Sequence, residues 1–199
     1  MGPIGVLALQ GDFREHLQTF EELGVPTTRV RKPADLTGIS GLVIPGGEST
    51  VIDKLSSVYE LREPIITLIQ NGLPAFGTCA GLILLADRIV DGIEGQKTFG
   101  GLDVAVQRNA FGSQLDSFEA DLNFAGIDRP VHAAFIRAPI VLDAGPSVQK
   151  LATLEDGRVV AVRQGNLLGI SFHPEVTGEN AVHEYFVEMC KTADFQSAN

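Results

Sequence analysis

The chain has 199 residues, of which 44% are hydrophobic, a length that allows one well-buried core and is short for two. Its 15 lysines and arginines against 25 aspartates and glutamates give a formal net charge of -10. That balance argues against a nucleic-acid partner, because phosphate binding needs a basic surface.

Buried strands and amphipathic helices alternate in the first half of the chain. Residues 4–9 form a continuous apolar run, typical of a strand buried on both faces of a parallel sheet. From Phe13, apolar residues recur at helical spacing until Gly24. This alternation predicts a three-layer α/β sandwich, in which helices flank a central, mostly parallel sheet. Further strands are expected at 25–30, 41–44 and 75–77, and further helices at 49–55, 61–71 and 80–86.

The second half of the chain has a more antiparallel pattern. Asp156-Gly157 separates two β-rich runs, which is a strong hairpin signal. With no internal repeat or linker, we expect a single domain over residues 1–199. Strands are expected at 104–108, 132–137, 148–155, 158–163 and 167–172, and a closing helix at 179–191.

Targeting signals and cysteine usage indicate the cellular compartment of the protein. The amino terminus lacks the charged flank of a signal peptide, and no stretch reaches the length of a membrane span. Cys79 and Cys190 form neither a CxxC pair nor a metal-ligand spacing with the four histidines. We expect a cytoplasmic protein with free thiols, no membrane contact, no metal and no cofactor.

The segment Gly77-Thr78-Cys79-Ala80-Gly81 lies between a predicted strand and a predicted helix. A nucleophile on so sharp a turn has a strained backbone, and flanking glycines leave room for it. The amides at the start of the helix favour a thiolate, and the Ala80 amide is placed to bind an oxyanion. The alternative is a plain strand-to-helix turn in which the cysteine only packs.

His173 and Glu175 follow the last predicted strand. In an extended segment, residues two apart project to the same side, so Glu175 can bind one ring nitrogen of His173 while the other nitrogen faces the thiol. Together with Cys79 this would be a nucleophile, a base and an orienting carboxylate. The alternative is a structural histidine at the end of a strand.

A glycine loop, Pro45-Gly46-Gly47-Glu48-Ser49-Thr50, follows another predicted strand at the end where α/β proteins bind ligands. It lacks the lysine of a phosphate loop and the spacing of a dinucleotide fingerprint. The Gly47 amide is expected to complete an oxyanion hole with Ala80, the alternative being a helix start capped by Ser49.

Arg108 and Arg137 follow strand-like runs and are candidates to bind a substrate carboxylate, although most arginines in such places are solvated. The remaining histidines and the second cysteine, namely His16, His132, His183 and Cys190, are interpreted as structural or surface residues.

These segments, in this order, resemble the class I, or triad, glutamine amidotransferases, and within them the glutaminase subunits of pyridoxal 5'-phosphate synthase. The resemblance spans nearly the whole chain. The cysteine elbow and the His-x-Glu pair mark the superfamily, and four other blocks indicate the vitamin B6 branch. These blocks are Leu7-Ala8-Leu9-Gln10-Gly11, Pro45-Gly46-Gly47-Glu48-Ser49-Thr50, Arg108-Asn109-Ala110-Phe111-Gly112 and Phe135-Ile136-Arg137-Ala138-Pro139.

The resemblance implies that Cys79, His173 and Glu175 form a catalytic triad. It implies hydrolysis of L-glutamine to L-glutamate and ammonia through a cysteine thioester. The ammonia would pass to a separate pyridoxal 5'-phosphate synthase subunit in a hetero-oligomeric complex, because 199 residues leave no room for a second catalytic barrel. Ser113 stands where the family often has arginine, so no contact is carried over there. The residues implied to hold glutamine are Gly47, Glu48, Ser49, Arg108, Ile136 and Arg137.

Three alternatives stay open. An amidase or peptidase would use the same elbow on another substrate. A binding or regulatory module would keep the fold without activity, but the presence of both His173 and Glu175 argues against it. A glutaminase serving a different synthetase, such as one for histidine or tryptophan synthesis, is opposed only by the four branch-specific blocks.

Overall fold

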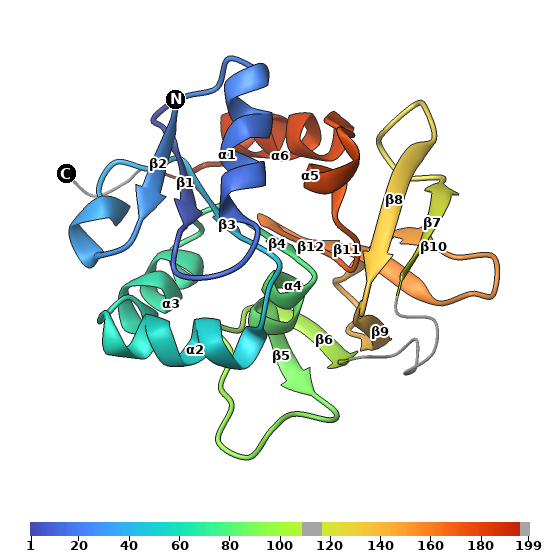
Figure 1. Ribbon diagram of the computed structural model, residues 1–199, viewed down its shortest axis with the longest axis horizontal. Coiled ribbons are helices and arrows are strands. Elements are labelled where there is room, and N and C mark those ends of the chain that lie inside the picture. Colours follow the sequence, from blue (N-terminus) through green and yellow to red (C-terminus); the bar gives the residue numbers. More distant parts are fainter. Residues whose placement is uncertain (109–116, 196–199) are drawn as a thin grey trace.

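A ten-stranded mixed sheet forms the centre of the computed structural model, which describes residues 1–108 and 117–195 (Figure 1). Its parallel part consists, in order across the sheet, of β2 (Thr27–Val30), β1 (Ile4–Leu7), β3 (Gly41–Ile44), β4 (Ala75–Thr78) and β12 (Leu167–Ile170). The sheet continues, with antiparallel pairing except between the last two strands, through β11 (Val159–Gln164), β9 (Ile140–Ala144), β6 (Leu102–Gln107) and β5 (Ala86–Ile89), and β10 (Gln149–Thr153) also pairs with β11.

Helices cover both faces of this sheet, which confirms the predicted three-layer α/β architecture (Figure 1). One face carries α1 (Phe13–Glu22), α5 (Pro174–Thr177) and α6 (Ala181–Thr192). The other carries α2 (Ser49–Val58), α3 (Arg62–Gln70) and α4 (Ala80–Leu85). A short 3-10 helix at Pro33–Leu36 lies between β2 and β3.

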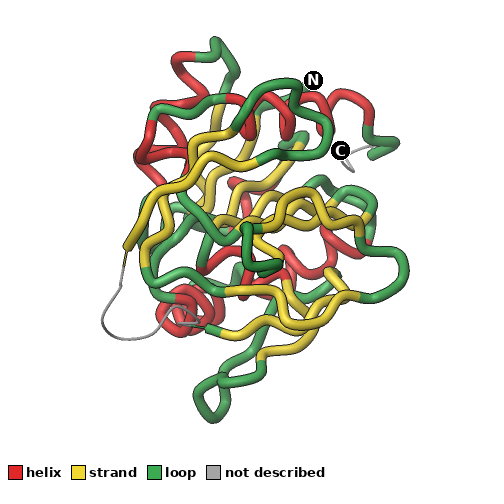
Figure 2. The backbone as a smooth tube through the Cα atoms, turned by 90° about the vertical axis from the view of Figure 1, so that its right-hand side faces the viewer, coloured by secondary structure: helices red, strands yellow, loops and turns green. Residues whose placement is uncertain are grey.

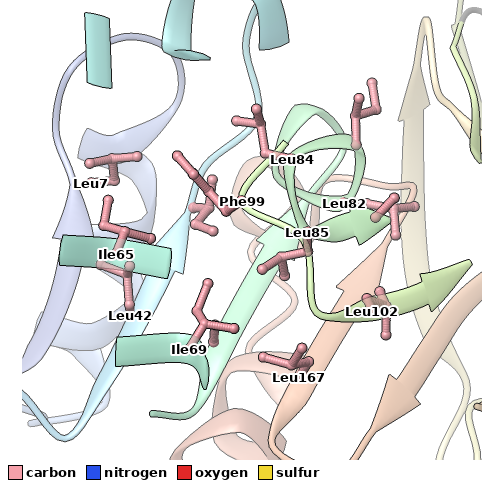
Figure 3. Close-up of a cluster of buried hydrophobic side chains, with 14 of the residues drawn as sticks. Leu7, Leu42, Ile65, Ile69, Leu82, Leu84, Leu85, Phe99, Leu102 and Leu167 are labelled. Atoms are coloured by element: carbon pink, nitrogen blue, oxygen red, sulfur yellow. The ribbon is translucent and has the colours of Figure 1, made fainter. Parts of the chain in front are cut away.

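Successive side chains of the central strands point alternately into two separate hydrophobic cores, one on each face of the sheet. Leu42 and Ile44 of β3 pack under α3 and α4, whereas Val43 between them packs against α1 and α6. Figure 3 shows the first of these cores. All residues of β1, β3, β4 and β12 are buried, as expected for parallel strands covered on both faces. Each large aliphatic side chain so buried contributes about 1.5–3 kcal/mol, so the strands that carry the site are firmly held.

Antiparallel pairing dominates the second half, as predicted. The strands β10 and β11 form the expected hairpin, and Gly157 in its turn has a φ of 86°. β7 (Ser117–Leu122) and β8 (Val131–Ile136) form a separate two-stranded sheet at the β-rich end of the molecule, which faces the viewer in Figure 2. No helix in residues 1–108 and 117–195 is long and apolar enough to cross a membrane.

Three strands, a helical turn and the 3-10 helix at Pro33–Leu36 were not predicted. The helix that follows Cys79 ends at Leu85, and β5 begins at the next residue. The apolar sequence has no turn residue there to mark the change. β7 is largely exposed, and β9 has only two buried residues, so neither has the strong apolar signal of a central strand. The turn α5 is too short to show helical periodicity.

Candidate active site

Three loops meet at the carboxyl ends of neighbouring parallel strands. In the register of the sheet, Ile44 at the end of β3 lies beside Gly77 of β4, and Ile170 at the end of β12 lies beside Thr78. The glycine loop, the cysteine elbow and the His-x-Glu segment therefore begin side by side. This edge is where open α/β sheets bind their ligands.

Cys79 has the strained backbone expected of a nucleophile elbow, with φ 48° and ψ -101°. Both flanking glycines are required by close backbone contacts. A Cβ on Gly77 would lie 2.4 Å from the Gly81 carbonyl, and one on Gly81 would lie 2.0 Å from the carbonyl oxygen of Ile44. Cys79 is the N-cap residue of α4, and only 7% of its surface is exposed. The packing thus holds Cys79 in its unusual conformation.

His173 and Glu175 form the predicted pair, because Nδ1 of the imidazole lies 2.8 Å from Oε1 of the carboxylate. The expected geometry was wrong, since the segment is not extended. His173 is the N-cap of α5, Pro174 starts that helix, and the Glu175 side chain reaches back from its first turn. Both side chains are buried, so the contact is shielded from water.

The protonation of His173 is set by its two neighbours. Burial alone lowers its pKa, but hydrogen bonds to Cys79 and Glu175, and the negative charge on each, raise it to about 10. Burial raises the pKa of Glu175, while the hydrogen bond to His173 works in the opposite direction. An imidazolium at neutral pH next to Cys79 is the partner that stabilises a thiolate. His173 is therefore electrostatically coupled to both other members of the candidate triad.

Asp12 and Gly46 also lie against the imidazole and were not assigned from the sequence. An Asp12 carboxylate oxygen is 3.4 Å from Nδ1 of His173, and the Asp12 amide donates to the Gly46 carbonyl at 3.0 Å. A Cβ on Gly46 would lie 2.4 Å from Cε1 of His173. Asp12 follows β1, the neighbour of β3, so the rule that sites form at carboxyl strand ends was the available signal.

One group of side chains has the spacing of a metal site. Among the described residues, Asp12, His173 and Glu175 alone place three possible ligand atoms within 4.8 Å of one another. The hydrogen bond between His173 and Glu175 already uses Nδ1 and one carboxylate oxygen. That no metal or cofactor is needed stays a prediction.

The Gly47 loop is anchored by Gln10, another residue that sequence reasoning did not assign. The Glu48 amide donates to Oε1 of Gln10 at 2.8 Å, and Gly47 has a φ of 144° that favours glycine. Neither the Gly47 nor the Ala80 amide donates a hydrogen bond to any residue in the described part of the chain. Both are therefore available to an anionic oxygen, although the oxyanion hole itself stays a prediction.

Three of the predicted glutamine-binding residues lie together. Nη2 of Arg108 donates to Oε1 of Glu48 at 2.8 Å, and only 12% of the Arg108 side chain is exposed. Gln96 links this ion pair to Ser49, because its amide nitrogen donates to the Ser49 hydroxyl at 2.9 Å and its oxygen accepts from Arg108 at 3.4 Å. No sequence signal singles out Gln96. Ser113 and the 109–112 part of its block lie outside the described residues.

Ile136 is the last residue of β8, and Arg137 follows it. The Ile136 carbonyl oxygen lies 4.0 Å from the Cys79 sulfur, which brings this segment to the elbow. Arg137 has a φ of 46°, a left-handed conformation that a non-glycine residue rarely adopts. Its exposed side chain makes no ion pair or hydrogen bond with a described residue, so it is free to meet a ligand.

The remaining histidines and Cys190 differ in their surroundings. His132 is exposed and hydrogen-bonds Asp121 on the neighbouring strand at 2.8 Å. Burial raises the pKa of Cys190 to about 12, so this thiol is inert as a nucleophile. His16 and His183 are fully buried side chains in contact with each other, their ring nitrogens 2.8 Å apart.

These two histidines predict acid sensitivity. Burial lowers the pKa of His183 to about 3, and burial and the neighbouring histidines lower that of His16, so both stay neutral in the fold while the unfolded chain protonates near pH 6.5. The free energy of unfolding is therefore expected to fall as the pH drops below about 6.5, by up to about 1.4 kcal/mol per pH unit for each histidine. Urea unfolding of wild type and His183→Gln between pH 7.5 and 5 measures this. The variant should lose stability less steeply, and equal slopes would show that His183 does not contribute.

Comparison with known proteins gives the same assignment over nearly the whole chain. Residues 6–192 match the SNO glutamine amidotransferase family. The proteins named pyridoxal 5'-phosphate synthase subunit PdxT from Clavibacter michiganensis and Nocardia farcinica are 60% and 52% identical. The alignments cover 96% and 98% of this chain and 93% and 89% of those proteins, respectively.

Solved structures agree. A crystal structure of a glutamine amidotransferase, 46% identical, superimposes with a TM-score of 0.90 and covers 96% of this chain and 100% of that one. A glutamine amidotransferase from Thermotoga maritima is 16% identical with a TM-score of 0.60, covering 96% of this chain and 84% of its own, and so shares the fold. The resemblance drawn from the sequence is confirmed, and the chain belongs to the SNO glutamine amidotransferase family.

Proposed function

We propose that this chain hydrolyses L-glutamine to L-glutamate and ammonia and supplies the ammonia to a separate synthase subunit that makes pyridoxal 5'-phosphate. The observation that carries the chemistry is the meeting of the Cys79 elbow and the His173–Glu175 pair at the carboxyl ends of neighbouring parallel strands. The family match and the names of the relatives support the substrate and the destination of the nitrogen.

Hydrolysis proceeds in two halves at this site. The Cys79 thiolate attacks the side-chain amide carbon of glutamine, and the resulting oxyanion is held by the Ala80 and Gly47 amides. His173 donates its proton to the departing ammonia, leaving a glutamyl thioester. The neutral imidazole then takes a proton from water, which attacks the thioester and releases glutamate. Glu175 keeps the ring oriented and favours its protonated form.

Recognition of free glutamine follows from the charge pair beside the elbow. The substrate carries an α-carboxylate and an α-ammonium group, and Arg108 and Glu48 present the complementary charges 2.8 Å apart. The Ile136 carbonyl lies 4.0 Å from the Cys79 sulfur, and Ser49 is joined to Arg108 through Gln96, which supports a place for both residues in the glutamine site. We expect glutamine to be cleaved in preference to asparagine and peptide amides, and equal rates on all three would indicate a general amidase.

Arg108→Met is expected to raise KM for glutamine by about 10- to 100-fold with a smaller change in kcat, because a charge-assisted hydrogen bond to the substrate is lost. Steady-state glutamate release measures both constants. Arg88→Met is the matched control, since Arg88 forms its own ion pair with Asp103 at the exposed strand β5. A KM for the Arg108 variant equal to that of the control would remove Arg108 from the glutamine site.

The proposed partner is tested by mixing the chain with a synthase subunit of pyridoxal 5'-phosphate synthase. We expect a hetero-oligomeric complex in analytical ultracentrifugation and faster glutamate release. Absence of both, with the glutaminase intact, would rule out the role in vitamin B6 synthesis and leave a glutaminase for another synthetase. The single domain over 1–199 and the cytoplasmic location stay predictions, the first supported by a family match that covers 6–192.

A further inference from the structure

A buried polar chain runs behind the candidate triad, on the face of the sheet covered by α1 and α6. His16 of α1 lies between three other elements: its Nδ1 is 2.8 Å from Nε2 of His183 on α6, and its Nε2 is 3.2 Å from the hydroxyl of Thr78 on β4. The same Nε2 lies 3.7 Å from Oε1 of Glu175 on α5. All four side chains are buried, so the contacts among them are shielded from water.

The hydrogen-bond partners of the two imidazoles indicate which ring nitrogens carry protons. Nδ1 of His183 is buried without a partner among the described residues. A buried N–H without an acceptor is rarer in proteins than a buried acceptor without a donor, so the proton of His183 belongs on Nε2, where it is donated to His16. Nδ1 of His16 is then an acceptor, and the His16 proton is on Nε2. In the opposite tautomers, the lone pair of His16 Nε2 would point at the Glu175 carboxylate, and the two would repel each other.

We propose that His16 is a positioning residue for the triad: held in one tautomer by His183, it directs an N–H at Thr78 and at the buried Glu175 carboxylate. This inference rests on the proposed role of Glu175. Oε1 of Glu175 binds His173, and its Oε2 has no partner in the described part of the chain, so few groups hold this carboxylate in its charged form. A nearby N–H dipole in a site shielded from water favours that charge.

Low basicity of the two imidazoles suits this role. Burial lowers the pKa of both rings, so His16 and His183 remain neutral and act as fixed dipoles rather than as proton carriers. Phe76 meets the His16 ring edge-on, and Phe20 does the same for His183, which keeps the rings in place. Without the His16 dipole, the charged form of Glu175 is less favoured. The protonated form of His173, which that charge stabilises, is then less favoured too.

The test replaces His16 with leucine and with glutamine, whose amide N–H can stand near Nε2. His16→Leu is expected to lower kcat for glutamine about 10- to 100-fold, as for a slightly displaced catalytic group, with KM within about twofold. The pH profile of Cys79 alkylation should shift as His173 loses basicity, and His16→Gln should restore most of kcat. Met189→Ala, a buried residue of the same core on α6, is the packing control and should leave kcat and the profile unchanged.

Equal kcat in His16→Leu and Met189→Ala, or no recovery in His16→Gln, would overturn the proposal. Should His16→Leu fail to fold, His183→Gln and His183→Leu carry the same test, because only glutamine can still donate to Nδ1 of His16. A higher kcat for the glutamine variant supports the proposal, and equal values overturn it. Activity that survives in Cys79→Ala would instead refute the proposed function itself.

Discussion

Replacing Cys79 with alanine is expected to lower kcat for glutamine hydrolysis by about 10⁴-fold or more, because no other group in the site can form the thioester. Alanine keeps the Cβ and therefore the strained backbone at φ 48°, so the fold and the glutamine site should survive. Glutamate release in the presence of the synthase subunit measures the activity, and glutamine binding by calorimetry checks the site.

Cys190→Ala is the matched control for this loss. Cys190 is the other free thiol, buried in the core on α6, where burial raises its pKa to about 12. Its replacement should leave kcat unchanged and affect only stability. Undiminished hydrolysis by Cys79→Ala, or a loss of kcat in both variants alike, would contradict the assigned nucleophile.

Gly46→Ala is expected to lower kcat by about 100-fold, although the change adds a single methyl group. The new Cβ would lie 2.4 Å from Cε1 of His173 and 2.9 Å from a carboxylate oxygen of Asp12. Because a backbone hydrogen bond from Asp12 holds residue 46 in place, the imidazole must move. A displacement of about 1 Å in a catalytic group lowers kcat by about 100-fold. Steady-state kinetics with and without the partner measure the effect.

Gly92→Ala is the control for adding a methyl group to a loop. A Cβ there would meet the Ile89 side chain at 3.3 Å, a contact that a small shift relieves. We expect wild-type kcat from this variant. If Gly46→Ala also retained wild-type kcat, the imidazole would not need its observed position, and the role of His173 as acid and base would be in doubt.

The chemical core of the site was predictable because its signals are local in the sequence. The glycines at 77 and 81 report a backbone so tightly packed that a Cβ on Gly77 would lie 2.4 Å from the Gly81 carbonyl, and the spacing of His173 and Glu175 reports a contact within one turn. The sheet then brings these segments together, because β3, β4 and β12 are neighbouring strands whose carboxyl ends lie at one edge. Short apolar strands buried on both faces were predictable for the same reason.

Residues brought in by tertiary packing were not predicted, although the place of Asp12 after a buried strand was an available signal. Asp12 and Gln10 reach the site because β1 lies beside β3, and Gln96 joins Ser49 and Arg108 from an irregular segment. His16 was interpreted as structural or surface because nothing in its own helix points to chemistry. Its contact with Glu175 depends on the packing of α1 against α5, and no pattern in a single sequence encodes that distance.

The central claim, that Cys79 is acylated by glutamine, is tested most directly by trapping the thioester. The holoenzyme, with its synthase subunit, is mixed with glutamine, quenched in acid within milliseconds, and examined by intact mass spectrometry and peptide mapping. We expect one glutamyl group per chain, on the peptide that contains Cys79, formed and lost at rates that match turnover. A His173→Gln chain should accumulate little of it. Turnover without any acyl group on Cys79, or with the group on another residue, would contradict the account.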